Sequence, residues 1–357
     1  MSWHPLDRLA REPQTCIWEI TRRCNLQCIH CENCCGERSA RELSAEQIAT
    51  TARALVELGC RHLHVTGGEP LLHPQWEELC RTFVRLGLRT SLITNGTLLD
   101  DDRLARAQGA GVAAVGISLD GLEATHDSIR LRAGAGPSPF RTAMAAVKRA
   151  CASLPTVVIT AVNRRNLAEL PALRQLLADV GAQRWQIQLV IPVGRALEVA
   201  EPFVIAPAQL EELMAFIAEA RKGGQPPHID TSDTIGYFTE RELELRGPAG
   251  QPRLWTGCQA GIRALAITYD GRVRGCSIMP PEFDAGDLHD EPITTIWNDA
   301  ERFAYSTRFD ARKLAGACGR CQVGPLCRAG CTTMAYWTTG SIYSNPFCLY
   351  RIRGAQA

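Results

Sequence analysis

The chain has 357 residues, of which 45% are hydrophobic and 22% charged, with a formal net charge of +1. This length can hold one large α/β domain and a smaller one, and the near-neutral charge excludes long-range attraction to nucleic acid or an anionic membrane. No apolar run reaches the ~20 residues that cross a bilayer, and the N-terminus lacks a secretory signal, so we expect a cytoplasmic protein without nucleic-acid or membrane partners.

The first part of the chain alternates strands and helices. Apolar and β-branched runs predict strands over 15–21, 62–66, 89–94, 112–119, 156–162 and 184–191. Ser44 and Gln47 form a capping-box pattern that opens a helix ending near Gly59, while Pro74 and Gly87 mark the start and end of the next helix. Further helices are predicted over 101–108, 140–151, 167–180 and 207–222. Six strand–helix units in a row favour a parallel sheet, either open or a partial barrel.

This alternation ends near Gly223. Residues 223–257 are rich in Gly and Pro and are predicted to form a bridging segment with one short helix over 234–245. From Cys258 to Cys348 the chain is rich in loops and cysteines, with a hairpin predicted over 264–275 that turns on Asp270 and Gly271. Segments of this composition are typically held together by metal.

The chain contains 16 cysteines, an unusual number for a protein of this kind. In a long chain without a secretory signal, clustered thiols indicate metal ligands or catalytic groups rather than disulfides. Four cysteines lie within or beside predicted strands and helices and are interpreted as buried small hydrophobes: Cys16, Cys60, Cys80 and Cys151.

Directly after the first predicted strand, Cys24, Cys28 and Cys31 form a C-x3-C-x2-C pattern. Three thiolates on one loop can bind three corners of a [4Fe–4S] cluster, whose usual complement is four cysteines, and they leave one iron open for a substrate. Zinc is the alternative. The loop leaves the C-terminal end of a strand, where α/β barrels place their chemistry.

A second motif, Gly67-Gly68-Glu69-Pro70, follows the next predicted strand. The glycines let the backbone approach a ligand closely, and the carboxylate can accept hydrogen bonds from an ammonium group. A plain glycine turn before a helix is the alternative.

Together these motifs resemble the radical S-adenosylmethionine (SAM) superfamily, whose cluster motif and methionine-amino-group motif they match. The segment 117–121 is similar to one that contacts SAM in relatives, and Thr94-Asn95-Gly96 recurs there too. The resemblance implies a partial (β/α)6 barrel in which SAM chelates the open iron. The implied SAM contacts are Gly67, Gly68, Glu69, Pro70, Asn95, Ser118, Asp120 and Arg130. Arg130 or Arg132 could pair with the SAM carboxylate, or either could be a solvated surface arginine.

Seven more cysteines occupy the C-terminal region. Zinc ribbons usually carry two C-x2-C knuckles, whereas only one is present here. The pattern closely resembles the SPASM extension of radical SAM enzymes, which implies two auxiliary [4Fe–4S] clusters. By this resemblance the first would be held by Cys258, Cys276 and Cys331, and the second by Cys318, Cys321, Cys327 and Cys348.

The resemblance covers residues 15 to 350 and implies five segments. These are an N-terminal extension (1–14), the radical SAM partial barrel (15–222), the bridging segment (223–257), the SPASM auxiliary-cluster domain (258–348) and a tail (349–357).

Three departures from the family pattern stand out. Some relatives have an eighth cysteine where this chain has Ala264, so the first auxiliary cluster is expected to have an open iron or a ligand from elsewhere. Ser277 replaces the catalytic aspartate of anaerobic sulfatase-maturing enzymes, which counts against that activity. Glu32 stands where relatives often have an aromatic residue. Cys34 and Cys35 are interpreted as small packing residues, with spare ligands or redox partners as the alternative.

The resemblance implies that reduction cleaves SAM to a 5′-deoxyadenosyl radical, which abstracts a hydrogen atom from the substrate. We expect a net oxidation, such as a crosslink, of a ribosomally made peptide, with flavodoxin or ferredoxin as the electron donor. Only 23 residues precede Cys24 and nine follow Cys348, so leader recognition is expected from a separate protein or from the barrel itself.

Two other function classes stay open. The stretch 17–24 is similar both to peptide maturases and to enzymes that modify haem precursors, so an enzyme oxidising a tetrapyrrole precursor, a sugar or an amino acid is the alternative. A non-enzymatic iron–sulfur electron carrier would have no use for Gly67–Pro70 or for an open cluster. The sequence does not identify a general base.

Overall fold

The computed structural model describes residues 4–132, 134–239, 242–247 and 253–354. In this part of the chain ten strands form one sheet, in the order β10-β9-β8-β1-β2-β3-β4-β5-β6-β7. Strands β8 and β1 to β7 run parallel, while β9 and β10 are antiparallel. The strands are β1 (Thr15–Glu19), β2 (His62–Thr66), β3 (Arg89–Thr94), β4 (Ala114–Ser118), β5 (Thr156–Val162), β6 (Arg184–Leu189), β7 (His228–Thr231), β8 (Ala264–Ile267), β9 (Arg272–Arg274) and β10 (Gly286–Asp287).

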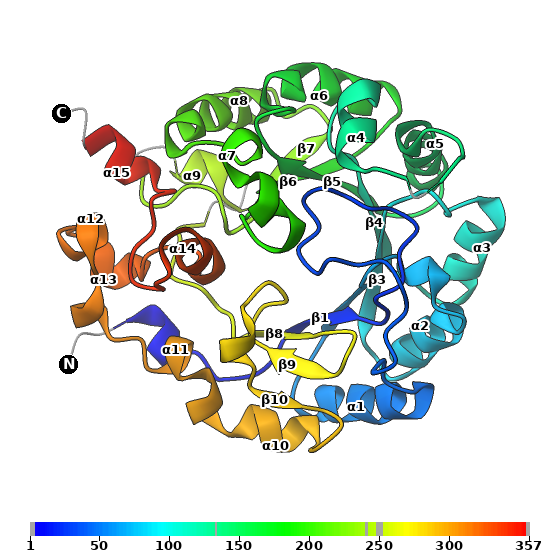
Figure 1. Cartoon of the computed structure of the whole chain (residues 1–357), viewed down its shortest axis with the longest axis horizontal. Coiled ribbons are helices and arrows are strands. Elements are labelled where there is room, and N and C mark those ends of the chain that lie inside the picture. The colour runs from blue at the N-terminus through cyan, green and yellow to red at the C-terminus, as the bar shows by residue number, and fades with distance from the viewer. Residues whose placement is uncertain (1–3, 133, 240–241, 248–252, 355–357) are drawn as a thin grey trace.

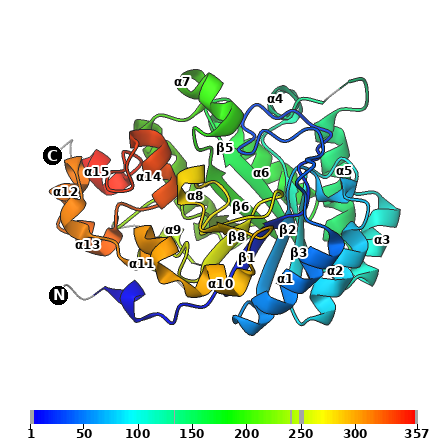
Figure 2. The ribbon, with the colours of Figure 1, turned by 60° about the horizontal axis from the view of Figure 1, so that its bottom comes forward.

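The first helices cover the outer side of the curved sheet, and the C-terminal helices α11 to α15 lie together beyond β8 (Figures 1 and 2). The helices are α1 (Ala45–Glu57), α2 (Trp76–Arg85), α3 (Asp101–Gly109), α4 (Glu123–Ile129), α5 (Pro139–Cys151), α6 (Leu170–Asp179), α7 (Ala200–Phe203), α8 (Leu210–Lys222), α9 (Glu242–Leu245), α10 (Ile293–Asn298), α11 (Ala304–Thr307), α12 (Gly316–Gly319), α13 (Gly324–Cys327), α14 (Thr332–Thr339) and α15 (Leu349–Gly354).

Local signals place most barrel elements. Strands β2, β3 and β5 have the predicted bounds, and β1, β4 and β6 are shorter than predicted by two or three residues. The capping box that opens α1 is confirmed, because Ser44 and Gln47 each bond the other's backbone N–H. Gly87, at φ +90°, ends α2 as predicted. The predicted start at Pro74 is wrong, because a turn carries the chain to Trp76 before α2 begins.

The sheet extends beyond the six predicted strands. Strand β7 lies inside the predicted bridging segment and pairs with β6, and β8 pairs with β1 at the other edge. The α/β fold with a radical SAM type of parallel sheet is confirmed, but this sheet has eight parallel strands in the described part of the chain. The predicted hairpin is confirmed as β8 and β9. The predicted helix over 234–245 is wrong for 234–239, which are irregular because Gly236 and Phe238 adopt a positive φ. Residues 240–241 lie outside the described residues, and α9 forms the end of the predicted range.

The hydrophobic core lies between the sheet and its outer helices. Trp18 on β1 stacks on Phe83 of α2, with the ring centroids 5.7 Å apart. Three of the cysteines interpreted as core residues (Cys16, Cys60 and Cys80) are buried, while Cys151 is half-buried at the end of α5. No helix in the described ranges is long and apolar enough to cross a membrane.

Candidate active site

The loop after β1 brings Cys24, Cys28 and Cys31 together on the wall of one cavity. Backbone hydrogen bonds hold the loop at both ends. The Cys24 N–H donates to the Gly36 carbonyl at 2.8 Å, and the Ile29 N–H donates to the Ile129 carbonyl at 3.0 Å. The three thiols therefore sit on a loop whose backbone is anchored by the rest of the barrel.

Arg195 reaches this loop from the segment after β6. Its Nε donates to the Cys28 carbonyl at 2.8 Å and its Nη1 to the Cys35 carbonyl at 3.1 Å. Its backbone N–H donates to the Cys31 carbonyl at 3.1 Å. Gly194 permits this approach, because a Cβ there would lie 2.4 Å from the Cys31 carbonyl oxygen. Sequence reasoning missed Arg195, because the contact joins residues 167 positions apart.

The thiols on this loop fit a cationic iron centre. Burial raises the pKa of Cys24 to about 12 and that of Cys28 to about 11. A coordinated iron stabilises the thiolate form that burial alone disfavours. A hydrogen bond from Cys35 lowers the pKa of Cys31. Cys35 is thus a buried residue that also supports Cys31, whereas Cys34 is exposed and the packing interpretation is wrong for it.

Gly67 and Gly68 line the cavity beside the cysteine loop, and their lack of a side chain lets the two loops touch. A Cβ on Gly67 would lie 2.3 Å from the Thr21 carbonyl oxygen, and one on Gly68 would lie 2.3 Å from the Arg23 carbonyl oxygen. The Gly68 N–H donates to the Thr21 carbonyl at 2.8 Å. The glycines therefore serve close packing of two backbone segments, in addition to the ligand approach that we predicted.

Glu69 and Pro70 lie behind this surface and are buried. The Glu69 carboxylate accepts hydrogen bonds from the Thr94 hydroxyl at 2.8 Å and from the Asn95 N–H at 2.8 Å. Burial raises its pKa to about 7. These contacts join the loops after β2 and β3, so the structure shows Glu69 as an organiser of the site, while its contact with SAM stays a prediction.

Asn95 and Ser118, both predicted SAM contacts, line the same cavity as the cysteines. The Asn95 side chain donates to the Asn25 side chain at 2.9 Å, and Asn25 donates to Thr97 at 2.8 Å. This network joins the cysteine loop to the loop after β3. Sequence reasoning missed Asn25, although it directly follows the first cluster cysteine.

Asp120 and Arg130 form a buried pair beside the cysteine loop. The Arg130 Nε lies 2.7 Å from Asp120 Oδ2, and the His30 Nε2 lies 3.3 Å from the same oxygen. Arg130 Nη1 lies 4.0 Å from the Cys28 sulfur and Arg130 lines the cavity, so it is not a solvated surface residue. Burial alone would raise the pKa of Asp120, but the charges of Arg130, His30 and His126 outweigh it, and the pKa lies below its usual value.

Replacing Asp120 by Asn should lower the free energy of unfolding by about 3 kcal/mol, because Arg130 then stays buried without its counter-charge. We also expect a higher KM for SAM, since the guanidinium loses its fixed orientation. Thermal denaturation and SAM titration measure both effects. Asp102→Asn is the control, because the Asp102 side chain is 77% exposed. Equal stabilities of the two variants would contradict this role of the ion pair.

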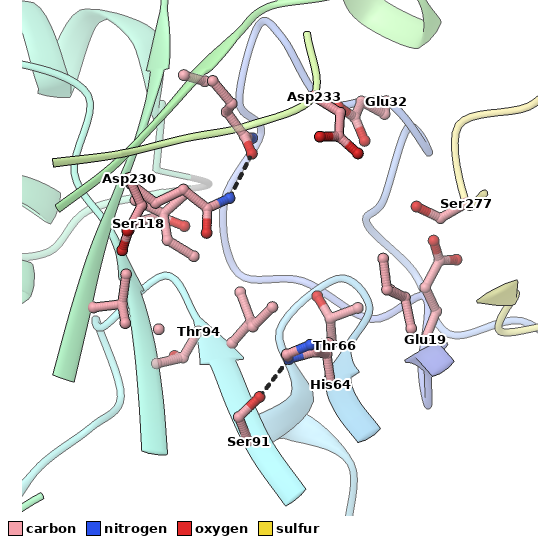
Figure 3. Close-up of a pocket in the computed structure, with 18 of the residues that line it drawn as sticks. Glu19, Glu32, His64, Thr66, Ser91, Thr94, Ser118, Asp230, Asp233 and Ser277 are labelled. Carbon is pink, nitrogen blue, oxygen red and sulfur yellow. Dashed lines mark hydrogen bonds between the residues drawn. The ribbon is translucent and has the colours of Figure 1, made fainter. Parts of the chain in front are cut away.

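The cavity measures about 940 Å³ and runs along the inside of the barrel. At one end it is lined by the cysteine loop, and at the other by the first residues of several strands, including His62, Arg89 and Arg184. Between them the wall is polar, with His64 bonded to Ser91 at 2.6 Å (Figure 3). It also includes Gly257, Gln259 and Ser277, which are the neighbours of Cys258 and Cys276. The barrel interior thus connects the cysteine loop after β1 with the first predicted auxiliary site.

The two predicted auxiliary sets lie in different places. Mutual charge effects on their pKa values show that Cys258, Cys276 and Cys331 are neighbours. A separate pocket of about 420 Å³ is lined by Cys318, Cys321, Cys327 and Cys348. Cys318 belongs to α12 and Cys327 to α13, and these helices lie apart from the strands of the barrel (Figure 1). No three His, Cys, Asp or Glu side chains in the described residues are arranged around a single metal ion.

Three acidic side chains line the cavity: Glu19, Glu32 and Asp233 (Figure 3). Burial raises the pKa of Glu19 to about 8 and that of Glu32 to about 7. Glu19 Oε2 is buried and has no partner among the described atoms. Sequence reasoning missed Glu19 and Asp233, and singled out Glu32 only as a departure from a position that is often aromatic in relatives.

Comparison with known proteins agrees with this geometry. Residues 18–177 match the model of the radical SAM superfamily, and residues 258–322 match that of an iron–sulfur cluster-binding domain, SPASM. The chain is 30% identical, over 96% of its length and 98% of the relative's, to the AdoMet-dependent heme synthase of Methanosarcina barkeri. The chain belongs to the radical SAM superfamily. It is a radical SAM/SPASM enzyme that uses SAM and multiple [4Fe–4S] clusters.

A peptide cyclase is also among the relatives. The chain is 30% identical, over 95% of its length and 91% of the relative's, to the PqqA peptide cyclase of Gluconobacter oxydans. Its fold matches Streptococcus suis SuiB bound to the precursor peptide SuiA with a TM-score of 0.73, covering 95% of this chain and 76% of that one at 14% identity. The similarity to SuiB shows the fold alone. The comparisons therefore leave open whether this radical SAM enzyme acts on a peptide or a small molecule.

Proposed function

We propose that this radical SAM/SPASM enzyme oxidises a ribosomally made peptide, with loss of two hydrogens that ends in a crosslink. The observation that carries the proposal is the cavity, which extends through the barrel from the cysteine loop past the first auxiliary site. An extended chain can lie along such a passage, and His64, Ser91 and Gln186 offer hydrogen-bonding groups on its wall. The PqqA peptide cyclase relative supports a peptide substrate.

Residues in different parts of the cavity are assigned different roles in this reaction. We assign Cys24, Cys28 and Cys31 to the SAM-binding cluster, with Gly67, Gly68, Asn95 and Arg130 at the SAM site. Bound SAM supplies, on reduction, a 5′-deoxyadenosyl radical that takes a hydrogen atom from the substrate. The barrel wall positions the substrate and excludes water. The auxiliary cysteine sets provide a place for the second electron, first beside the cavity and then toward the C-terminal helices.

The test uses synthetic peptides encoded by short reading frames beside the gene, incubated anaerobically with the reconstituted protein, SAM and a reductant. We expect one peptide to lose two hydrogens, located by tandem mass spectrometry. A Cys276→Ala variant should still cleave SAM but yield at least ten-fold less product, because the electron acceptor beside the cavity is impaired. Unchanged masses for every peptide would refute the peptide substrate.

A haem precursor is the second candidate, favoured by the similarity to the AdoMet-dependent heme synthase over nearly both full lengths. The cavity is also lined by Arg89, Arg184 and Arg253, which can pair with substrate carboxylates. Incubation with an iron porphyrin bearing carboxylate side chains distinguishes the two. If the mass of the porphyrin changes and the masses of all the peptides do not, the substrate is a haem precursor and the peptide proposal is wrong.

A further inference from the structure

The first auxiliary site has three cysteines for a cluster that usually takes four. Cys258, Cys276 and Cys331 are neighbours, and position 264 is an alanine at the start of β8. The fourth iron is therefore either open or bound by a ligand from another residue type or another part of the chain. Among the described residues, one side chain from the segment after β7 can supply such a ligand.

Asp233 lies two residues beyond the end of β7, on the wall of the cavity that Glu32 and Ser277 also line (Figure 3). Its side chain is 67% exposed and it lines the interior cavity. Arg246 Nη1 binds Asp233 Oδ1 at 3.1 Å. Within the described residues, Oδ2 accepts no hydrogen bond and remains available to a ligand.

The Asp233 segment is tied directly to one of the cysteines. The Tyr237 hydroxyl donates to the Asp233 carbonyl at 2.7 Å and accepts from the Cys331 N–H at 3.0 Å. Arg246 donates to the carbonyls of Ile235 and Gly236 at 2.6 and 2.7 Å, which holds the turn in place. Together with burial, the Asp233 charge raises the pKa of both Cys258 and Cys331.

We propose that Asp233 supplies the fourth protein ligand of the auxiliary cluster held by Cys258, Cys276 and Cys331, through the carboxylate oxygen that Arg246 leaves free. A carboxylate donates less charge to iron than a thiolate does. Replacing a thiolate by a weaker donor raises the reduction potential of a cluster, as it does when histidines replace cysteines in Rieske centres. The ligand thus makes the cluster nearest the cavity a better acceptor for an electron from the substrate.

Two other side chains near this site are rivals. The Tyr305 hydroxyl is buried, and the charges of Cys258 and Cys276 help to raise its pKa, but no hydrogen bond among the described residues ties it to Cys331. Glu32 affects Cys276 but directly follows Cys31, so its backbone belongs to the radical-cluster loop. Neither is connected to Cys331 as Asp233 is.

The test measures the cluster itself and needs no substrate. Asp233→Ala and Asp233→Cys are each made in a full-length chain in which Cys24, Cys28 and Cys31 are alanine, so that only auxiliary clusters contribute. After anaerobic reconstitution and mild oxidation, Asp233→Ala should lose about one of about eight irons per chain and show a three-iron signal in electron paramagnetic resonance. Asp233→Cys should retain its iron and have a lower reduction potential than the parent.

Asp230→Asn is the matched control, because Asp230 lies three residues earlier, lines the same cavity and pairs with Arg184 at 2.7 Å. It should leave iron content and spectra unchanged. Aspartate labelled with carbon-13 gives a direct readout, since its hyperfine coupling to the reduced cluster should be present in the parent and absent from Asp233→Cys. A coupling that survives in Asp233→Cys, or iron loss in that variant, would overturn the assignment. The same measurement with carbon-13-labelled glutamate tests Glu32. If a hyperfine coupling from labelled glutamate is present in the parent and lost only in Glu32→Gln, the fourth ligand is Glu32.

Discussion

Replacing Cys24, Cys28 and Cys31 together by alanine should abolish SAM cleavage and remove about a third of the bound iron. The three thiols share one loop and one cavity wall, and SAM has no iron to chelate without the cluster that they are assigned to hold. Anaerobic reconstitution, iron analysis and chromatography of 5′-deoxyadenosine measure both effects. The remaining iron should belong to the two auxiliary sets.

Cys34→Ala is the control for this triple variant. Cys34 follows the same loop, but its side chain is exposed. It should keep full iron content and full SAM cleavage. If the triple variant still produces 5′-deoxyadenosine, the radical cluster has been assigned to the wrong residues, whatever the substrate of the enzyme is.

Gly68→Ala should lower the rate of SAM cleavage by about 100-fold, because displacing a catalytic loop by about 1 Å costs that much. The added methyl group would lie 2.3 Å from the Arg23 carbonyl oxygen and 2.6 Å from that of Arg22. Both atoms are backbone, so relief requires the loop before Cys24 to move. Steady-state 5′-deoxyadenosine formation without substrate measures the loss.

Gly36→Ala provides the matched comparison. A Cβ on Gly36 would meet no atom within 4 Å, although its carbonyl accepts a hydrogen bond from Cys24. We expect less than a two-fold change in the same assay. Equal rates for Gly68→Ala and the parent would show that the contact between the two loops does not position the SAM site.

Local sequence signals were sufficient for much of the barrel. The bounds of β2, β3 and β5 follow from short apolar runs, and the start of α1 follows from Ser44 and Gln47, because both features act within a few residues. Helix α4 was not predicted. It has seven residues, and its N-cap residue, Leu122, makes no side-chain cap, so no local signal marks its start.

The pairing of distant segments could not be read from the sequence. Strand β7 lies in a segment rich in Gly and Pro, and it is a strand because β6 offers it an open edge. Strand β8 joins the sheet through β1, more than 240 residues earlier in the chain. Whether a segment forms backbone hydrogen bonds at the edge of a sheet depends on which strand the fold places beside it. The local amino-acid composition of the segment does not show this.

The sequence by itself determined the chemistry of this protein. The spacing of Cys24, Cys28 and Cys31 and the motif at Gly67–Pro70 identify a radical SAM enzyme, because cluster binding needs particular residue types close together in the chain. The tertiary structure alone decided that Glu69 organises two loops, that Arg195 holds the cysteine loop, and that Tyr237 links the Asp233 backbone to that of Cys331. These relations join residues far apart in the chain, and only folding brings their side chains within reach of one another.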